Sequence, residues 1–362
     1  MSSRLTAIYR VCCDAGAIED RARAIAVEQS VEMPLAAIDD EYVRSEIMGR
    51  VEAIRDLGDG RFEVRISLAA ETAGADAGQL INMLFGNSSL HEDVTLHDIE
   101  TPDDLAGVFG GSRHGVEELR RRVGAGRRAL TCSALKPQGL PAEKLAELAG
   151  KFAQGGIDYV KDDHGLADQA YAPFTARVAA ITCAFRHSGC GARYVPSLSG
   201  DLDSMRRQIA LAVDAGIDTV LVAPMIMGLA NFHRLVRDHP AIAFLAHPAL
   251  TGLRISPVAL LGKLFRLLGA DAVIFPNHGG RFGYSADTCR RLAQALREDR
   301  EGLTPSLPVP AGGMSRERVP EMLDFYGADS MLLIGGALLE TGDRLVEATS
   351  AFAAQVQRHR YG

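Results

Sequence analysis

The sequence predicts an α/β protein in which a C-terminal (β/α)8 TIM barrel follows a smaller N-terminal α+β domain of ferredoxin-like type. From about residue 115, short apolar runs alternate with stretches whose apolar residues recur every three or four positions, as in 141–154 and 257–268. Strands that alternate with helices indicate parallel βαβ units, and eight units in about 250 residues match a closed barrel. The predicted strands are 129–137, 158–163, 193–200, 219–225, 242–248, 272–277, 307–313 and 330–336.

An open, doubly wound parallel sheet is the alternative architecture. It predicts a GxGxxG turn after an early strand, and no predicted strand of this chain is followed by one.

Residues 1–112 have a different pattern, so we assign them to a separate domain from the barrel at 113–362. Segment 61–68 alternates like a half-buried strand after the turn Gly58-Asp59-Gly60, and 5–12 is a second strand candidate. Helices are predicted at 17–29 and 75–84, and at 340–358 in the tail. The glycine-containing segment 101–111 reads as a connection.

Composition excludes some classes of protein. The chain has 362 residues, 47% of them hydrophobic, and a formal net charge of -7. A nucleic-acid binder would usually have a basic excess. No stretch approaches the roughly 18 consecutive apolar residues of a membrane span. Six scattered cysteines in a chain of this size indicate reduced thiols, so we expect a cytoplasmic protein that binds neither nucleic acid nor membrane.

Ionisable residues follow several predicted strands. The first ends at Lys136, the second at Lys161, Asp162, Asp163 and His164, and the fifth at His247; His278 and Arg281 follow the sixth. The carboxyl ends of barrel strands meet at one rim, where barrel enzymes carry their active sites. Each residue also has an ordinary explanation: a solvated turn with a capping aspartate, a snorkelling lysine, or a loop cation. Their convergence favours a site.

Two glycine pairs follow the last two strands, Gly312-Gly313 and Gly335-Gly336. Bare backbone N–H groups can approach an anion there, and barrel phosphate sites commonly lie at this position. The alternative is a pair of turns that need positive φ. Two pairs on adjacent strands favour a phosphate site, to which Arg281 could add charge.

With these residues assembled, the chain resembles the RuBisCO superfamily, and within it the RuBisCO-like (type IV) large-chain proteins. The motifs that carry the likeness are Ser133-Ala-Leu-Lys-Pro-Gln-Gly-Leu140, Gly155-Gly-Ile-Asp-Tyr-Val-Lys-Asp-Asp-His164, Ala246-His-Pro248, Phe85-Gly-Asn-Ser88 and the two glycine pairs. The resemblance covers nearly the whole chain.

The resemblance implies roles for individual residues. Lys161 matches a lysine that CO2 carbamylates and that then helps bind Mg2+, and Asp163 matches a metal-ligand aspartate. Lys136 and His247 match active-site residues. Glu28 and Asn87 match residues that reach the active site of a partner subunit, which implies a homodimer with shared sites. The glycine pairs match phosphate-contacting turns.

Departures from the family pattern are equally informative. His164 stands where the third metal ligand is usually glutamate, although Mg2+ prefers oxygen ligands. Gln138 replaces a second lysine, and Arg281 falls about where carboxylases have a mobile-loop lysine. Pro248 and the pair Ile274-Phe275 stand near positions that are polar in carboxylases, which would leave room for a less polar substrate end. We therefore expect no ribulose-bisphosphate carboxylation.

The remaining groups suit enolisation of a phosphorylated ketose, with Lys136 or His164 as the base. Among the activities that the resemblance implies, we favour 5-methylthioribulose 1-phosphate isomerase, in methionine salvage. Alternatives are diketo-methylthiopentyl phosphate enolase and a decarboxylase of a sugar-acid phosphate such as 3-oxo-isoapionate 4-phosphate. A non-catalytic binding protein also stays open, because His164 weakens the metal site. An aldolase with a Schiff base on Lys136 or Lys161 is disfavoured, since Lys161 beside two aspartates should stay protonated.

Overall fold

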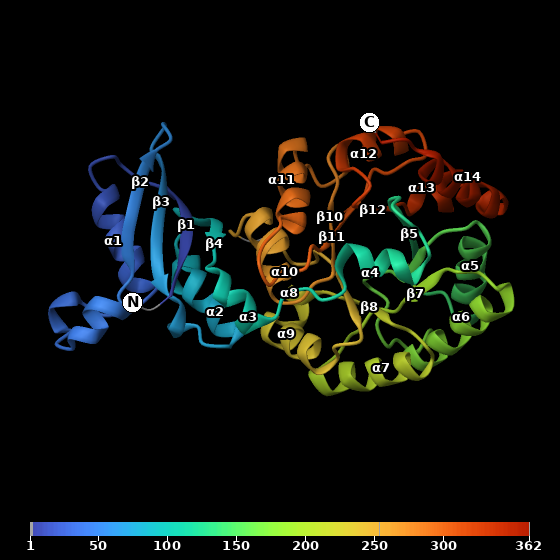
Figure 1. Cartoon of the computed structure of the whole chain (residues 1–362), viewed down its shortest axis with the longest axis horizontal. Helices are drawn as coiled ribbons and strands as arrows, with labels where there is room; N and C mark the ends of the chain where they lie inside the picture. The colour runs from blue at the N-terminus through green and yellow to red at the C-terminus, as the bar shows by residue number, and fades with distance from the viewer. Residues whose placement is uncertain (1–2, 253, 362) are drawn as a thin grey trace.

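The structure is a computed structural model that describes residues 3–252 and 254–361. It contains an antiparallel sheet of four strands and a parallel sheet of eight, as the sequence predicts (Figure 1). No helix within those residues has the length and apolar character that a membrane crossing needs.

The N-terminal elements follow the order β-α-β-β-α-β, and the sheet order β2-β3-β1-β4 is the ferredoxin-like one. Two predicted strands and two predicted helices are present, and the sequence analysis missed β2 and β4. The elements are β1 (Arg4–Cys12), α1 (Ile18–Glu28), β2 (Arg50–Asp56), β3 (Arg61–Ala69), α2 (Ala77–Phe85) and β4 (Val94–Glu100).

The segment predicted as a plain connection contains helix α3 (Asp103–Phe109). Leu105, Ala106 and Phe109 are buried on one side of it, and Gly110, with φ of 83°, ends it in a left-handed conformation. The glycine read as a loop signal is therefore a helix cap. The proposed division into residues 1–112 and 113–362 falls between α3 and α4 (Gly115–Arg122).

All eight predicted barrel strands form. They are β5 (Leu130–Leu135), β6 (Tyr159–Asp162), β7 (Arg193–Val195), β8 (Thr219–Val222), β9 (Ala243–Ala246), β10 (Ala272–Pro276), β11 (Leu307–Ala311) and β12 (Met331–Leu333). Their order runs from β7 through β6, β5, β12, β11, β10 and β9 to β8. A bridge between Ser197 and Leu221 closes the ring, with Leu221 N donating to Pro196 O at 2.8 Å.

Helices surround the barrel on the outside (Figure 1). They are α5 (Ala142–Gln154), α6 (Phe174–Ser188), α7 (Leu202–Asp214), α8 (Pro224–Met227), α9 (Leu229–Asp238), the π-helix η5 (Val258–Leu264) with α10 (Phe265–Leu267), α11 (Ala286–Arg297), α12 (Val319–Tyr326), α13 (Gly336–Leu339) and α14 (Leu345–Arg358). The predicted final helix thus begins five residues later than expected, after a short 3-10 turn.

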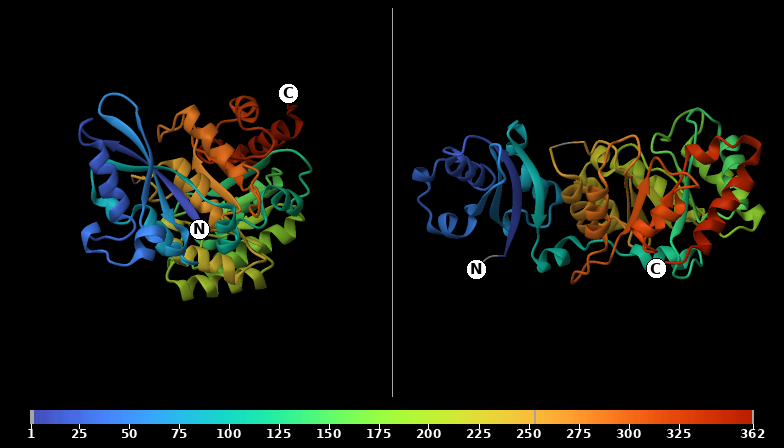
Figure 2. Two further views of the ribbon diagram at one scale, coloured as in Figure 1. Left: turned by 60° about the vertical axis from the view of Figure 1, so that its left-hand side comes forward. Right: turned by 90° about the horizontal axis from the view of Figure 1, so that it is seen from above.

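The N-terminal sheet lies at one side of the barrel (Figure 2). Its strand β4 forms a parallel bridge from Leu96 to Ile255, and Ser256 N donates to Leu96 O at 2.8 Å. Lys263 from η5 pairs with Asp98 at 2.7 Å. These contacts attach the N-terminal domain to the outside of the barrel. They do not involve the carboxyl ends of the barrel strands.

Strand alternation separates two cores. Residues that face the barrel lumen form one cluster, including Leu130, Tyr159, Leu245, Ile274 and Val309. Residues that face the surrounding helices join a second, larger cluster. Side chains alternate along each strand, so only every second residue can reach the lumen and the rim above it.

Candidate active site

Lys161 lies in the upper part of the barrel lumen, two residues beyond the lumen residue Tyr159 on β6. It is 3% exposed, and its Nζ donates to Asp162 O at 2.8 Å. Burial, with the nearby positive charge of Lys136, lowers the pKa of Lys161 despite Asp163 and Asp162. Burial thus opposes the charged form of Lys161 more strongly than the two aspartates favour it, and one of these aspartates turns away from the lumen.

Asp162 faces the helices outside the barrel, as strand alternation requires. Its carboxylate accepts hydrogen bonds from Arg177 Nε at 2.9 Å, Tyr194 OH at 2.8 Å and Ser197 N at 3.0 Å. Asp162 and Arg177 are both fully buried. This aspartate belongs to the packing behind the strand and is not exposed to a ligand in the lumen.

Asp163 returns to the rim and joins two other predicted residues. Lys136 Nζ lies 3.2 Å from both carboxylate oxygens, and His164 Nδ1 lies 3.4 Å from Oδ1. Burial alone would raise the pKa of Asp163, but the hydrogen bond from His164 and the charges of Lys161 and Lys136 lower it. Asp163 is therefore an anion at neutral pH.

His164 and His247 stack on each other, with ring centroids 4.0 Å apart and an interplanar angle of 10°. His247 Nδ1 accepts a hydrogen bond from Ala249 N at 3.1 Å, so its neutral ring carries the proton on Nε2. Burial and the positive charge of Lys161 lower the pKa of His247 to about 2. A neutral imidazole with a free Nε2–H donor results.

The five residues Lys136, Lys161, Asp163, His164 and His247 thus form one cluster, which we call the mouth cluster. They come from β5, β6 and β9, whose carboxyl ends meet at the same rim. The sequence analysis predicted all five for this rim.

The two glycine pairs behave differently. Gly312 and Gly313 have φ of 84° and 64°, and a Cβ on Gly313 would lie 2.8 Å from Gly280 Cα. Glycine is thus required at both positions by the positive φ, and at Gly313 also by the close approach of the loop that follows β10. At Gly335 and Gly336, φ is not positive and a Cβ would meet open space. Neither the turn nor packing within the chain explains the second pair.

Among the described residues, the N–H groups of these four glycines have no hydrogen-bond acceptor. Free amides after adjacent strands β11 and β12 can receive an anion. The pairs are brought near each other because Ala311 and Leu333 pair across these strands.

Arg281 lies in the exposed loop after β10. Its guanidinium stacks on the Phe282 ring, 4.7 Å from the centroid. Within the described chain it has no hydrogen-bond or ion-pair partner, so it is available to a ligand but does not touch the mouth cluster.

Glu28 and Asn87 meet on the N-terminal domain. Asn87 Nδ2 donates to Glu28 Oε1 at 2.8 Å, although 59 residues separate them. No contact in the described residues joins this pair to the mouth cluster of the same chain. The sequence analysis missed Gln29, whose buried amide donates to Met83 O at 2.7 Å and accepts from Ser88 N at 3.0 Å. The sequence offered one hint of this role, a glutamine close after the apolar stretch at the end of the predicted helix 17–29.

One expectation about the pocket is wrong. Ile274 faces the lumen, but Phe275 is fully buried on the helix side and packs against Tyr326 with ring centroids 6.1 Å apart. Adjacent strand residues point to opposite faces, so only one of the two can approach a substrate.

The donor set decides which metal the cluster could hold. Among the described residues, no three His, Cys, Asp or Glu side chains are placed to bind an ion together. Asp163 supplies one hard oxygen ligand. Lys161 would supply another only as a carbamate, and the His164 imidazole is a poor third ligand for Mg2+. The side chains as they stand thus offer Mg2+ one oxygen donor, and a carbamate on Lys161 would be needed for a second.

Fold and site together define a (β/α)8-barrel protein with an ionisable mouth and two glycine turns whose amides have no acceptor among the described residues. Residues 115–356 match the family of the ribulose bisphosphate carboxylase large chain, catalytic domain. The chain belongs to this family.

Several relatives are similar over nearly the whole chain. A 5-methylthioribulose-1-phosphate isomerase from Rhodospirillum rubrum is 59% identical, covering 98% of this chain and 97% of that protein. A 2,3-diketo-5-methylthiopentyl-1-phosphate enolase from Geobacillus kaustophilus is 31% identical, covering 89% and 84%. The crystal structure of a Rubisco-like protein from Rhodopseudomonas palustris superposes with a TM-score of 0.92 at 49% identity, covering 99% of this chain and all of that one.

Proposed function

We propose that the protein is an enzyme that isomerises 5-methylthioribulose 1-phosphate by proton transfer. The observation that carries the proposal is the mouth cluster, in which a buried amine, an anionic carboxylate and two imidazoles meet at one rim. The 59% identity to an isomerase named for this substrate supports the choice of substrate class.

The phosphate of the substrate would bind the free amides of the two glycine pairs, with Arg281 adding a cation. These amides lie on β11 and β12, whereas the mouth cluster lies on β5, β6 and β9. A substrate held across the rim would place its carbonyl and hydroxyl carbons over the cluster.

The mouth cluster supplies the acid–base chemistry. Lys136 or His164 would remove a carbon-bound proton, and a second group would return it to another carbon of the enediolate. His247, as a neutral Nε2–H donor, would stabilise the oxygen on which negative charge develops. Asp163 would orient Lys136 and His164, which both contact its carboxylate.

Mg2+ would be held by Asp163 and by Lys161 carrying CO2, and it would supply electrostatic stabilisation of the enediolate oxygens. Only a neutral amine adds CO2, so the lowered pKa of Lys161 supports this part of the proposal. The imidazole of His164 argues for a proton-transfer role for this residue in preference to a ligand role.

The Glu28–Asn87 pair supports a homodimer in this proposal. The pair is remote from the mouth cluster of its own chain, so a partner subunit would have to bring its copy to the rim. We propose that this dimer acts in the cytoplasm.

The test is proton exchange in D2O, followed by 1H NMR, with 5-methylthioribulose 1-phosphate, Mg2+ and bicarbonate. Wild-type protein should exchange a carbon-bound proton and form an isomer. Lys161→Met, which keeps the aliphatic stem, should lose about 10²–10⁴-fold. A wild-type protein that binds the substrate without exchanging any proton would overturn the enzyme proposal in favour of a binding protein.

An enolase acting on 2,3-diketo-5-methylthiopentyl 1-phosphate is the second candidate, favoured by the 31% identity to such an enzyme. The same assay with that diketone distinguishes the two. Incorporation of labelled CO2 into ribulose bisphosphate would contradict our expectation that the protein is no carboxylase.

A further inference from the structure

The loop that carries Asp163 and His164 is anchored from behind by one buried arginine. Arg177 lies on α6 and is fully buried. Its Nε donates to Asp162 Oδ2 at 2.9 Å, and its Nη1 donates to the carbonyls of Ala167 at 3.0 Å and Ala172 at 2.6 Å. One guanidinium thus holds the strand end and both halves of the following loop.

The loop itself is cross-braced. Gln169 donates to Gly165 O at 2.7 Å and accepts from Ala167 N at 2.8 Å, and Leu166 N donates to Asp163 O at 2.9 Å. These bonds fix the shape of the loop. Asp168 Oδ1 also accepts from Phe174 N at the start of α6 at 2.7 Å, and Lys136 contacts Asp163. Arg177 differs from these residues because it bonds to the strand end and to both halves of the loop at once. Arg177 therefore links the backbone on both sides of Asp163 and His164 to α6.

Stability alone does not explain a buried ion pair here. Replacing such a pair with apolar residues is often neutral or stabilising. Arg177 Nη2 is moreover buried without a partner among the described residues, which is unfavourable for the folded state. The bonds to the two loop carbonyls offset this unfavourable term and give Arg177 a role beyond the ion pair.

We infer that Arg177, through Asp162, Ala167 and Ala172, is a positioning residue that holds Asp163 and His164 in register with Lys136 and His247. The inference rests on the proposed proton transfer for its functional consequence, because Arg177 does not itself touch the mouth. Misplacing reacting groups by about 1 Å can lower a rate about 100-fold.

The decisive variant is the double replacement Asp162→Leu/Arg177→Met. It removes the ion pair without leaving one charge buried alone, so the fold should persist. We expect kcat for proton exchange to fall about 10- to 100-fold with KM changed less than about threefold. Backbone amides of 164–172 should exchange faster in hydrogen-exchange mass spectrometry. The melting temperature should fall about as much as in the control below, because Tyr194 OH, Ser197 N and two loop carbonyls lose a partner.

Arg266→Met is the matched control. Arg266 is also buried and donates to three carbonyls, those of Ala295, Leu303 and Thr304, but these lie before β11, at the opposite end of the barrel. It should lower the melting temperature without slowing exchange per folded molecule or loosening 164–172.

Each outcome decides the inference. A folded double variant with wild-type kcat and wild-type amide protection overturns it, and so does a double variant that does not fold, since the pair would then serve stability. Wild-type protein without proton exchange refutes the proposed function instead, and protection of 164–172 still tests the anchor.

Discussion

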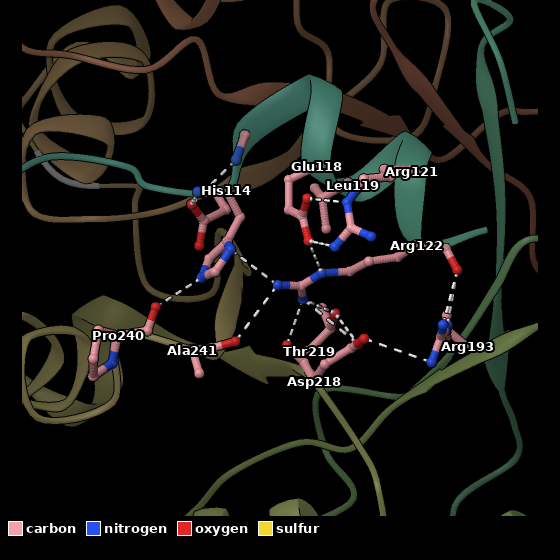
Figure 3. A network of polar contacts seen from close by, with 12 residues as sticks. His114, Glu118, Leu119, Arg121, Arg122, Arg193, Asp218, Thr219, Pro240 and Ala241 are labelled. Atoms are coloured by element: carbon pink, nitrogen blue, oxygen red, sulfur yellow. Dashed lines mark hydrogen bonds and ion pairs between the residues drawn. The ribbon is translucent and has the colours of Figure 1, made fainter. Parts of the chain in front are cut away.

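The two ends of the barrel both carry dense charge, but they use it differently. At the amino end of the strands, α4 covers the barrel. The side chain of Arg122, the last residue of α4, is 6% exposed and runs beneath the helix (Figure 3). Arg122 donates to Glu118, to the carbonyl of Asp218 at 2.6 Å and to the Thr219 hydroxyl at 3.1 Å, and it contacts His114 at 2.9 Å. Its carbonyl in turn accepts from Arg193.

The mouth has fewer internal partners for its charges. Lys136 and His164 have side chains 40% and 42% exposed, and they share one carboxylate. The glycine amides after β11 and β12 have no acceptor within the described chain, and Arg281, which stacks on Phe282, has no hydrogen-bond or ion-pair partner there. A saturated network stabilises the fold, whereas groups with spare hydrogen-bonding capacity can bind and react. Charge density alone would not have told the two ends apart.

The largest effect should follow from removing the charge at the centre of the mouth. Asp163→Asn keeps the shape and removes the anion that orients Lys136 and His164. We expect proton exchange to fall about 10²–10⁴-fold. The free energy of unfolding should fall by at most about 1–2 kcal/mol, because Lys136 and His164 are partly exposed and only Lys161 is buried. Kinetics and chemical denaturation measure the two quantities. A large loss of stability would show that the charge of Asp163 mainly stabilises the fold, as we propose for the charges at the amino end of the barrel.

Arg122→Met should produce the opposite pattern. It removes a donor from the buried Thr219 hydroxyl, the Asp218 carbonyl and the partly exposed Glu118. The free energy of unfolding should fall by about 3 kcal/mol, while kcat stays within about twofold. Arg121→Met is the control: Arg121 neighbours Arg122 and contacts the same Glu118, but its side chain is 75% exposed. Its loss should be below about 1 kcal/mol. Equal losses from both variants would contradict the saturated-network account.

Much of the mouth was readable from sequence, because strand ends of a barrel converge and the residues there were ionisable. The separate fates of Asp162 and Asp163 were also readable, since alternation along β6 sends them to opposite faces. The role of Arg177 could not be predicted from the sequence. Its three acceptors lie 5 to 15 residues away along the chain, and no local pattern brings them together.

The fold was predicted best where apolar periodicity was strong. Strand β2 escaped notice because it has no fully buried residue, as an edge strand beside β3. Helix α3 was hidden by the glycine that caps it. The roles of Glu28 and Asn87 came only from the resemblance. Their hydrogen bond was not predicted, because contact between segments 59 residues apart depends on tertiary packing.

The neutral His247 gives the mouth a pH signature in stability. Its folded-state pKa of about 2 lies below the unfolded value near 6.5. Between these values the unfolded state binds more protons, so this contribution is fully present above about pH 6.5 and declines as pH falls. From pH 7 to 5 the loss should be about 2 kcal/mol. Denaturation at both pH values should give a smaller difference for His247→Gln than for the wild type, and an unchanged difference would refute burial of a neutral ring.

The smallest expected effect concerns the anion site. Gly336 has room for a Cβ and lies in a helical turn, so Gly336→Ala should leave the fold intact and stabilise it by at most about 1 kcal/mol. The added methyl would occupy space that we assign to the substrate phosphate, and KM should rise about tenfold, or about 1.4 kcal/mol, with kcat little changed. Gly150→Ala on α5 also has open space and should stabilise similarly without altering KM. Both variants add one methyl group to a helical glycine. A rise in KM for Gly336→Ala alone would locate the substrate phosphate beside the second glycine pair. Identical KM values for the two variants would show that this pair does not bind the phosphate.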